Sequence, residues 1–393
     1  MSEKIKVGIF VDSFYPIIDG VSQVVNNYCH YLNEYDDVDV TLVTPRYPNA
    51  DYEKYGFKIY PYMSFGSNAK VSYRVGWPFV PKIIKDVKAM DFDIIHIHAP
   101  LCSSELVRLV NKSGKAKVVL TYHTKYDVDF EARIKTPLMK KVAYAFLKAN
   151  VNAADEVWIV SEGSESALRR VGFTGKCRVM ENGVDLQRGK AAPEKCEALK
   201  KKYNVPDGCP VFSFIGRMQW YKNIRLILDG LKILSDRGVD FRMFLVGDGF
   251  ELGEMKEYAA KLGLGGKVIF TGAVKEREEL RVFYSITDLF LFLSTFDTAA
   301  IVVKEAAACE CASLFAEGSD SAYGVVDGEN GWFTPEEPTA LADKVQAIIS
   351  DTDNLKKVGL NAAETLYKPW SVSVGNACKR YKELLGIEET ANV

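Results

Sequence analysis

Residues 288–307 read DLFLFLSTFDTAAIVVKEAA, and this stretch indicates how the chain folds. Its apolar run 288–293 is typical of a buried strand, and a helix is expected from about Ile301. Asp297 lies in the intervening loop and Glu305 about one turn into the helix, 305 − 297 = 8 positions later. In an open α/β sheet, ligands bind beyond the carboxyl ends of the strands, and a first helical turn offers unpaired N–H groups to an anion. The stretch is a candidate ligand site, although two acids at this spacing fit solvated helix residues equally well.

The composition indicates a soluble protein of two domains. The chain has 393 residues, 48% of them apolar, and a net charge of −2, so it is too long for one ordinary core. Without bulk basic charge, nucleic acid is not an expected partner. Eight cysteines are scattered, and no second pair or nearby histidine completes a metal site around Cys309 and Cys311. Reduced thiols, an N-terminus that runs straight into a strand and the lack of a long apolar run predict a cytoplasmic location without a signal peptide.

Apolar strands alternate with amphipathic helices along the chain, which predicts an α/β fold with doubly wound, mostly parallel sheets. Helices are expected at 22–35, 79–90 and 103–113 in the first half, and at 371–385 near the end. Strands are expected at 6–11, 38–43, 57–60, 94–98, 118–122, 157–160, 177–180, 211–217, 243–246, 268–271 and 288–293.

Three histidines lie at the ends of expected strands. His96 and His98 are two positions apart, so their side chains point to one face. A metal pair would lack further ligands there, and we expect a hydrogen-bonded core histidine at 96 and a residue at the edge of the ligand site at 98. His123 directly follows the apolar strand 118–122, which favours a functional role for it.

Residues 136–148, TPLMKKVAYAFLK, form a basic amphipathic helix with Thr136 at the N-cap and Pro137 in the first turn. One half of the helical wheel is apolar and the other half holds lysines. Such a helix can lie on an anionic membrane surface, but it also fits a helix that packs on its own sheet with solvated lysines. The residues assigned to a membrane or acceptor surface are Lys140, Lys141, Lys148 and Tyr126.

The stretch around Asp297 and Glu305 resembles the Glu-x7-Glu motif of retaining glycosyltransferases of family 4, also called group 1. These enzymes have the GT-B architecture, in which two doubly wound Rossmann-like domains face a cleft. The resemblance implies that Asp297 contacts the donor sugar and that Glu305 holds the nucleotide ribose. It also implies that backbone amides bind the hexose and diphosphate, here those of Ala300, Ile301 and Val302. The chain departs from the family pattern, which has Glu at 297, Gly at 300, Gly at 310 and Pro at 312.

Other segments resemble the same family. Gly216-Arg217 and Lys222 match its Gly-Arg…Lys pair, which implies that both cations stabilise the leaving diphosphate. Gly20 matches the first loop, where the backbone approaches the diphosphate, and Gly272 matches the loop that frames the nucleotide base. Asp91-x-Asp93 and Asp127-x-Asp129 match the Asp-x-Asp of metal-binding single-domain glycosyltransferases, but neither is expected to hold a metal.

The resemblance covers essentially the whole chain and predicts its division. Residues 1–185 are expected to form an acceptor domain, 186–209 a linker and 210–365 a nucleotide-sugar domain. Residues 366–393 are expected to return to the first domain as a helix.

The closest resemblance is to diacylglycerol glucosyltransferases, through Asp12…Gly20, Tyr73-Arg74, Trp77-Pro78-Phe79 and Tyr122-His123-Thr124. In those enzymes the histidine lies beside the reacting sugar carbon. We therefore expect a metal-independent hexosyltransferase that moves glucose from UDP-glucose to diacylglycerol, peripherally at the inner membrane face. One alternative is a soluble-sugar or polyprenyl-linked acceptor of surface-polysaccharide assembly. Another is an inactive nucleotide-sugar-binding protein.

Overall fold

The computed structural model describes residues 4–17, 19–48, 50–66 and 73–387. The chain forms two compact units, residues 1–182 with 370–393 and residues 183–369. Helix α14 (Trp370–Leu384) therefore belongs to the first unit. The stretch 186–209, assigned above to a linker, is part of the second unit. It contains helix α7 (Pro193–Lys202), whose Leu199 is buried in the core of that unit.

The first unit is built on a parallel sheet with the strand order β3-β2-β1-β6-β7-β8-β9. Its strands are β1 (Ile5–Phe10), β2 (Val38–Pro45), β3 (Lys58–Tyr62), β6 (Ile94–Ile97), β7 (Lys117–Tyr122), β8 (Glu156–Ile159) and β9 (Cys177–Val179). The central strands are mostly apolar and buried because helices cover both faces of the sheet. After β3, the short strands β4 (Ser64–Phe65) and β5 (Val75–Gly76) pair antiparallel.

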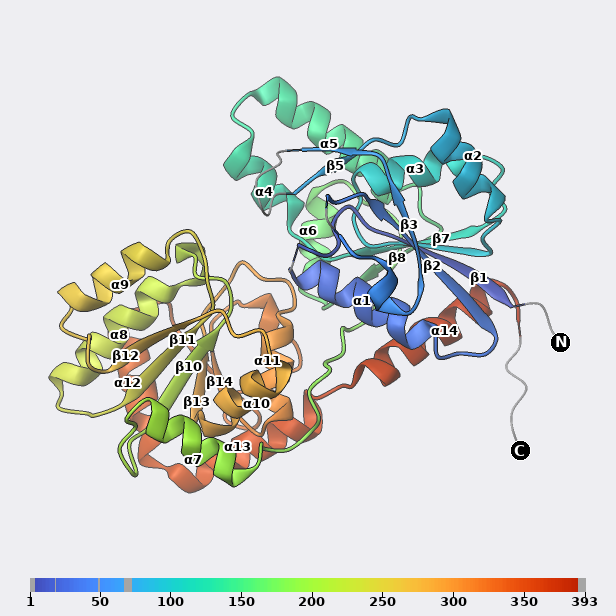
Figure 1. Cartoon of the computed structure of the whole chain (residues 1–393). Helices are drawn as coiled ribbons and strands as arrows, with labels where there is room; N and C mark the ends of the chain where they lie inside the picture. The colour runs from blue at the N-terminus through green and yellow to red at the C-terminus, as the bar shows by residue number, and fades with distance from the viewer. Residues whose placement is uncertain (1–3, 18, 49, 67–72, 388–393) are drawn as a thin grey trace. The chain divides into compact units, whose positions relative to one another are not determined.

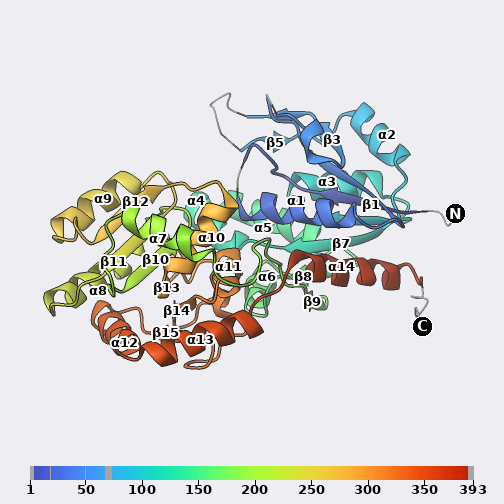
Figure 2. The same cartoon turned by 60° about the horizontal axis from the view of Figure 1, so that its bottom comes forward.

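Right-handed crossovers distribute the helices of this unit over the two faces of the sheet (Figures 1 and 2). Helix α1 (Gly20–Leu32) connects β1 to β2, and α3 (Cys102–Val110) connects β6 to β7 in the opposite direction along the sheet. The two helices consequently lie on opposite faces. Helix α14 packs against α1, and α2 (Pro81–Ala89) packs against α3. The unit also contains η1 (Glu53–Tyr55), α4 (Tyr126–Arg133), α5 (Pro137–Val151) and α6 (Ser164–Arg170).

The second unit repeats this plan with the strand order β12-β11-β10-β13-β14-β15. Its strands are β10 (Val211–Ile215), β11 (Arg242–Val246), β12 (Val268–Gly272), β13 (Leu289–Phe292), β14 (Ala312–Ala316) and β15 (Trp332–Thr334). Its helices besides α7 are η2 (Trp220–Lys222), α8 (Ile224–Asp236), α9 (Leu252–Lys261), α10 (Arg277–Ile286), α11 (Ile301–Ala308), η3 (Asp320–Ala322), α12 (Pro338–Ser350) and α13 (Thr352–Thr365). Helix α12 packs on α8, whereas α11 contacts α10 and α13.

The predicted fold class is confirmed, because both units are doubly wound parallel α/β structures. The expected strands agree with the observed ones to within about two residues. Strand β14 was not anticipated, although it is fully buried, because its sequence ASLFA is short and mixed. Helices α12 and α13 were also not anticipated.

Candidate functional site

Each sheet reverses its strand order once, and the predicted site residues lie next to these reversals. In the first unit the reversal is between β1 and β6, which Asp12 and His98 follow. In the second unit it is between β10 and β13, which Arg217 and Asp297 follow. The loops on either side of such a reversal run in opposite directions and leave a crevice at the carboxyl ends of the strands.

In the second unit the structure pairs Lys222 with Asp297. Lys222 ends the η2 turn before α8, and its Nζ contacts Oδ1 of Asp297 in the loop after β13. The two side chains are only 12% and 21% exposed, and Oδ2 of Asp297 is buried without a hydrogen-bond partner. The pair thus holds a fixed cation beside a carboxylate oxygen that has no hydrogen-bond partner in the protein. Arg217 is exposed in the loop after β10.

The backbone amides predicted to bind the donor lie at the N-terminus of α11. Ala300 is the N-cap and provides no side-chain cap, so the amides of Ile301 and Val302 occupy the first turn at the positive end of the helix. Ser321 orders the preceding loop, because its Oγ accepts from the Ala300 N–H at 3.2 Å and donates to the Asp297 carbonyl at 3.3 Å. No motif or spacing in the sequence pointed to this serine.

Glu305 is 3% exposed, and both of its carboxylate oxygens have partners. Oε1 accepts from Nη2 of Arg277 at 2.5 Å, and Oε2 accepts from the Tyr284 hydroxyl at 2.8 Å. Arg277 also pairs with Asp185. Burial, reinforced by the Glu305 charge, raises the pKa of Tyr284, so its hydroxyl remains a donor. Burial by itself lowers the pKa of Arg277, but its two carboxylate partners outweigh this and raise it. Both α10 residues were missed by the sequence analysis.

Close backbone contacts explain two glycines beside this site. A Cβ on Gly247 would lie 1.8 Å from the Gly216 carbonyl oxygen, and one on Gly249 would lie 2.2 Å from the Met218 carbonyl oxygen. The loops after β10 and β11 therefore pack backbone to backbone, and no larger residue fits at either position. The Gly272 carbonyl accepts from the Gly247 N–H at 2.9 Å, which fixes the third loop to the same network.

The positive φ of Glu310, +57°, explains why glycine is usual at this position. Glu310 follows the last residues of α11, at the opposite end of that helix from Ala300. The replacement of the usual glycine by Glu310 therefore affects the C-terminal end of α11 and leaves its N-terminus unchanged.

In the first unit Gly20 opens α1 and Asp19 caps it. Oδ1 of Asp19 accepts from the Ser22 N–H at 2.7 Å, and Ser22 Oγ accepts from the Asp19 N–H at 2.9 Å, so the helix begins at Gly20, two residues before the expected start. A Cβ on Gly20 would meet no atom within 4 Å, so the space beside the helix start is open.

The three predicted histidines form one cluster, which we call the histidine cluster (His96, His98 and His123); His96 and His98 are fully buried and His123 is half-buried. His96 is hydrogen-bonded to Tyr381 and Thr121, both at 2.6 Å, which agrees with the core role expected for it. Nδ1 of His98 lies 3.0 Å from Nε2 of His123. Nε2 of His98 is buried without a partner.

This geometry assigns the proton positions in the His98–His123 pair. A buried N–H without a partner is rarer and costlier than a bare acceptor, so we infer that the proton of His98 is on Nδ1 and is donated to His123. Neutral His123 then carries its own proton on Nδ1. Burial lowers the pKa of His123 to about 3 and the pKa values of His96 and His98 well below 6.5. His123 is therefore equipped to donate a hydrogen bond rather than to act as a base.

The histidine cluster should make the first unit unstable in acid. Unfolded histidines bind protons below about pH 6.5 whereas the native cluster stays neutral, so stability is fully present above pH 6.5 and is lost as the pH falls. Asp12 acts in the opposite direction, because burial raises its pKa to about 6. We expect the free energy of unfolding to fall between pH 7.5 and pH 5, with about 2 kcal/mol from His123 alone, a further loss in the same direction from His96 and His98, and a partial offset from Asp12.

Amide hydrogen exchange at the two pH values measures this effect, with the second unit as internal control. All four histidines of the chain precede residue 183. Protection should fall in β6 and β7 far more than in β10 and β11. An equal loss of protection in both units would contradict the role assigned to the cluster.

Helix α5 exposes the apolar residues of its N-terminal half and buries Leu147 and Val151 in the core of the first unit. Leu138, Met139 and Val142 are 70%, 61% and 62% exposed, and Phe146 is 38% exposed, whereas Leu147 is buried. The helix thus packs on its own unit near its C-terminus, as the packed alternative expects, and exposes apolar residues near its N-terminus, as a membrane helix would; both interpretations remain open. Lys141 and Lys148 are exposed, and Lys140 pairs with Glu131. Tyr126 opens α4 and packs against the core of the first unit, with its ring 5.6 Å from that of Tyr122.

The Asp-x-Asp segments are engaged in other interactions. Asp91 pairs with Lys115 at 2.5 Å, and Asp93 accepts from the Lys6 N–H at 2.8 Å before β6 begins. Asp127 pairs with Arg170 at 2.5 Å, and the Asp129 side chain lies outside the described residues. In the part of the chain that the structure describes, no group of three or more His, Cys, Asp or Glu residues is arranged to hold a metal ion.

Comparison with protein families matches both halves of the chain. Residues 18–188 match the family described as Glycosyltransferase Family 4, and residues 196–365 match Glycosyl transferases group 1. Within the described residues, no helix is long and apolar enough to cross a membrane.

Individual relatives share about a quarter of their residues with the chain. The alpha-monoglucosyldiacylglycerol synthase of Streptococcus pneumoniae is 24% identical over 311 residues, 77% of this chain and 69% of that protein. The GDP-mannose:cellobiosyl-diphosphopolyprenol alpha-mannosyltransferase of Xanthomonas oryzae is 23% identical over 406 residues, 97% of this chain and 98% of that protein. The crystal structure of Anabaena HepE in complex with UDP and glucose has a TM-score of 0.76 at 17% identity and covers 96% of this chain and 99% of its own. The shared fold is the GT-B architecture.

Proposed function

We propose that this chain, which belongs to the family 4, group 1 glycosyltransferases, moves glucose from UDP-glucose to diacylglycerol with retention of the anomeric configuration. The observation that carries the proposal is the second-unit site, where the Lys222–Asp297 pair and the uncapped α11 N-terminus lie beside the strand-order reversal. Such a site suits a diphosphate with an attached sugar. The HepE complex with UDP and glucose supports this donor, and the pneumococcal relative supports the acceptor.

In the proposed mechanism, the bond between the sugar C1 and the leaving diphosphate oxygen breaks while the acceptor hydroxyl approaches from the same face. The acceptor proton passes to the leaving phosphate, so no protein base is required. Arg217 and Lys222 stabilise the negative charge that grows on the diphosphate, and the α11 amides hold it in place. Asp297 binds a sugar hydroxyl through Oδ2.

An acceptor screen with labelled UDP-glucose tests this function. Diacylglycerol in mixed micelles, a polyprenyl-diphosphate-linked sugar and soluble sugars are compared, with GDP-mannose as the competing donor. A labelled lipid product from diacylglycerol supports the proposal. Transfer only to the polyprenyl-linked sugar would favour the second candidate, which the relative spanning 97% of the chain suggests. Neither transfer nor donor hydrolysis would indicate an inactive binding protein.

We also propose that α5 contacts the membrane surface from the cytoplasmic side. Its exposed apolar residues can enter the headgroup boundary, while Lys141 and Lys148 face anionic lipids. Replacing Leu138 and Val142 by serine should lower binding to anionic vesicles roughly tenfold, because part of the apolar transfer energy is lost. Lys141→Glu should lower it about fivefold, and Lys140→Glu less, because Lys140 already pairs with Glu131.

Vesicle co-sedimentation measures both effects. Leu360→Ser is the matched control, since Leu360 is 49% exposed but belongs to the second unit. If the control lowers binding as much as the α5 variants do, α5 is not the contact surface.

We further propose that transfer needs no divalent metal, because Arg217 and Lys222 supply the positive charge that a metal would otherwise provide. The transfer rate should be unchanged in EDTA. Loss of activity in EDTA that Mn²⁺ restores would refute this. As the control, the fold loss of activity on replacing Lys222 should be the same with EDTA and without it.

A further inference from the structure

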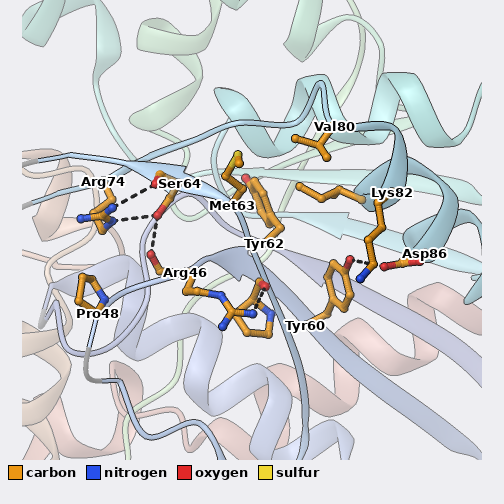
Figure 3. Close-up of a pocket in the computed structure, with 12 residues that line it drawn as sticks. Arg46, Pro48, Tyr60, Tyr62, Met63, Ser64, Arg74, Val80, Lys82 and Asp86 are labelled. Carbon is orange, nitrogen blue, oxygen red and sulfur yellow. Dashed lines mark hydrogen bonds between the residues drawn. The ribbon is translucent and has the colours of Figure 1, made fainter.

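A cavity of about 600 Å³ lies in the first unit, and none of the residues proposed to bind the donor line it. It is bordered by the ends of β2 and β3, by β4 and by the start of α2. Figure 3 shows Tyr62 in its middle, with Arg74 and Ser64 to one side and Tyr60, Lys82 and Asp86 to the other. We call this cavity the Arg74 pocket. None of the proposed steps of sugar transfer uses it.

The Arg74 pocket has a surplus of positive charge. Its lining contains Arg46, Arg74 and Lys82 but a single carboxylate, Asp86, which accepts from the Tyr60 hydroxyl at 2.9 Å. Three cations against one engaged acid leave a site that attracts an anion.

Arg74 is held so that one of its nitrogens has no protein partner. Its Nε donates to Ser64 Oγ at 2.8 Å and its Nη2 to the Ser64 carbonyl at 3.0 Å. Nη1 is buried without a hydrogen-bond partner. The bonds to Ser64 are with neutral groups, so the positive charge of Arg74 is left beside the pocket.

The start of α2 adds to this preference for anions. Val80 is the N-cap and offers no side-chain cap, and Pro81 occupies the first turn. The first-turn amides of Lys82 and Ile83 therefore belong to an uncapped helix end that lines the pocket. Helix N-termini of this kind bind phosphate.

Three exposed aromatic residues, Phe65, Trp77 and Phe79, lie next to the pocket. They indicate that the anion is the head group of an amphiphilic molecule. Met63 connects the pocket to these residues. It lines the pocket and is exposed, and its carbonyl accepts a hydrogen bond from the Trp77 N–H at 2.9 Å. The Trp77 ring lies 5.8 Å from Phe65 and 5.2 Å from Phe79, and all three rings are exposed. Aromatic side chains next to basic ones are typical of a membrane–water interface.

We propose that the Arg74 pocket binds a phosphate group carried by a lipid. The phosphate would accept from Arg74, Lys82 and the α2 amides, while Trp77 and its neighbours contact the apolar chain. Two lipids have this chemistry, an anionic phospholipid of the bilayer and the diphosphate of a polyprenyl-linked acceptor. Neutral diacylglycerol has no group that requires these cations. The inference rests on the proposed function only in taking the chain to work at a lipid surface.

Binding of the full-length chain to vesicles, measured without nucleotide sugar, tests the proposal. The vesicles contain phosphatidylcholine alone, phosphatidylcholine with phosphatidylglycerol, or phosphatidylcholine with polyprenyl diphosphate. Lys82→Gln should lower binding to the phosphate-rich vesicles about fivefold, and Arg74→Gln by more than tenfold. The matched control is Lys88→Gln, because Lys88 is exposed at the opposite end of the same helix and has no place in the pocket.

The other outcomes separate the two lipid sources and the role of the aromatic group. A preference for polyprenyl diphosphate that Arg74→Gln abolishes identifies an acceptor site, and an equal preference for phosphatidylglycerol identifies a bilayer lipid site. Trp77→Ala should weaken vesicle binding but leave the affinity for soluble glycerol phosphate unchanged. Arg74→Lys retains the positive charge and should bind the vesicles better than Arg74→Gln does. This recovery would show that the loss in Arg74→Gln comes from the missing charge and not from misfolding.

The proposal is overturned if Lys82→Gln and Lys88→Gln weaken binding equally, or if inorganic phosphate displaces the chain from vesicles as well as a lipid phosphate does. Because the assay contains no donor, these results are independent of sugar transfer. A chain that transfers glucose to diacylglycerol yet shows no phosphate-dependent binding would refute the pocket and leave the proposed function intact.

Discussion

Replacing Lys222 by methionine should lower kcat by about 10²- to 10³-fold, with a smaller change in the KM for the donor. The side chain keeps its length but loses the charge that stabilises the departing diphosphate, and that interaction strengthens only as the bond breaks. The structure adds a second cause, because Lys222 is the partner of the largely buried Asp297. Without it, the carboxylate would have neither of its oxygens paired in the protein. Steady-state kinetics with UDP-glucose measure the effect.

The double variant Lys222→Met with Asp297→Asn separates these two causes. If the loss came only from an uncompensated carboxylate, the second substitution would restore most of the activity. We expect little recovery, because the diphosphate still lacks its cation. Arg217→Ala is the comparison, since Arg217 should also act on kcat but is exposed. Full recovery in the double variant would contradict a direct role for Lys222.

The positions of the site residues could be predicted because the ends of the strands can be recognised in the sequence. Apolar runs such as 288–293 and 118–122 are followed by polar residues, which marks the carboxyl ends of the strands. In a parallel sheet these ends lie along the same edge. Asp297 and His123 were found in this way. The Lys222–Asp297 contact follows from two loops on either side of one strand-order reversal, which the sequence does not reveal directly.

Contacts that depend on packing between distant segments were not predictable. Arg277 and Tyr284 lie on α10, where an arginine and a tyrosine fit any amphipathic helix, and only the fold brings them to Glu305. The exposed face of α5 is a similar case. Helical periodicity shows that apolar residues share a face, but it does not show whether a sheet or solvent lies opposite that face.

Replacing Glu305 by glutamine should raise the Kd for UDP-glucose by roughly 10- to 100-fold, because a charge-assisted hydrogen bond to the ribose is worth about 1.5–3 kcal/mol. The same change should lower the free energy of unfolding by about 1–3 kcal/mol, since Arg277 loses one of its two carboxylate partners. Calorimetric titration with the donor and urea unfolding measure the two effects on the same variant.

Tyr284→Phe distinguishes a ribose contact from a purely structural role of Glu305. This variant removes the hydroxyl that donates to Oε2 but leaves the carboxylate and its Arg277 partner in place. If Glu305 binds the ribose, Tyr284→Phe should cost about 1 kcal/mol of stability and leave the donor Kd nearly unchanged, because Oε2 is freed for the ligand. An increase in Kd as large as that of Glu305→Gln would mean that the carboxylate only positions α10 against α11. The ribose would then have to be bound by other residues of the second unit.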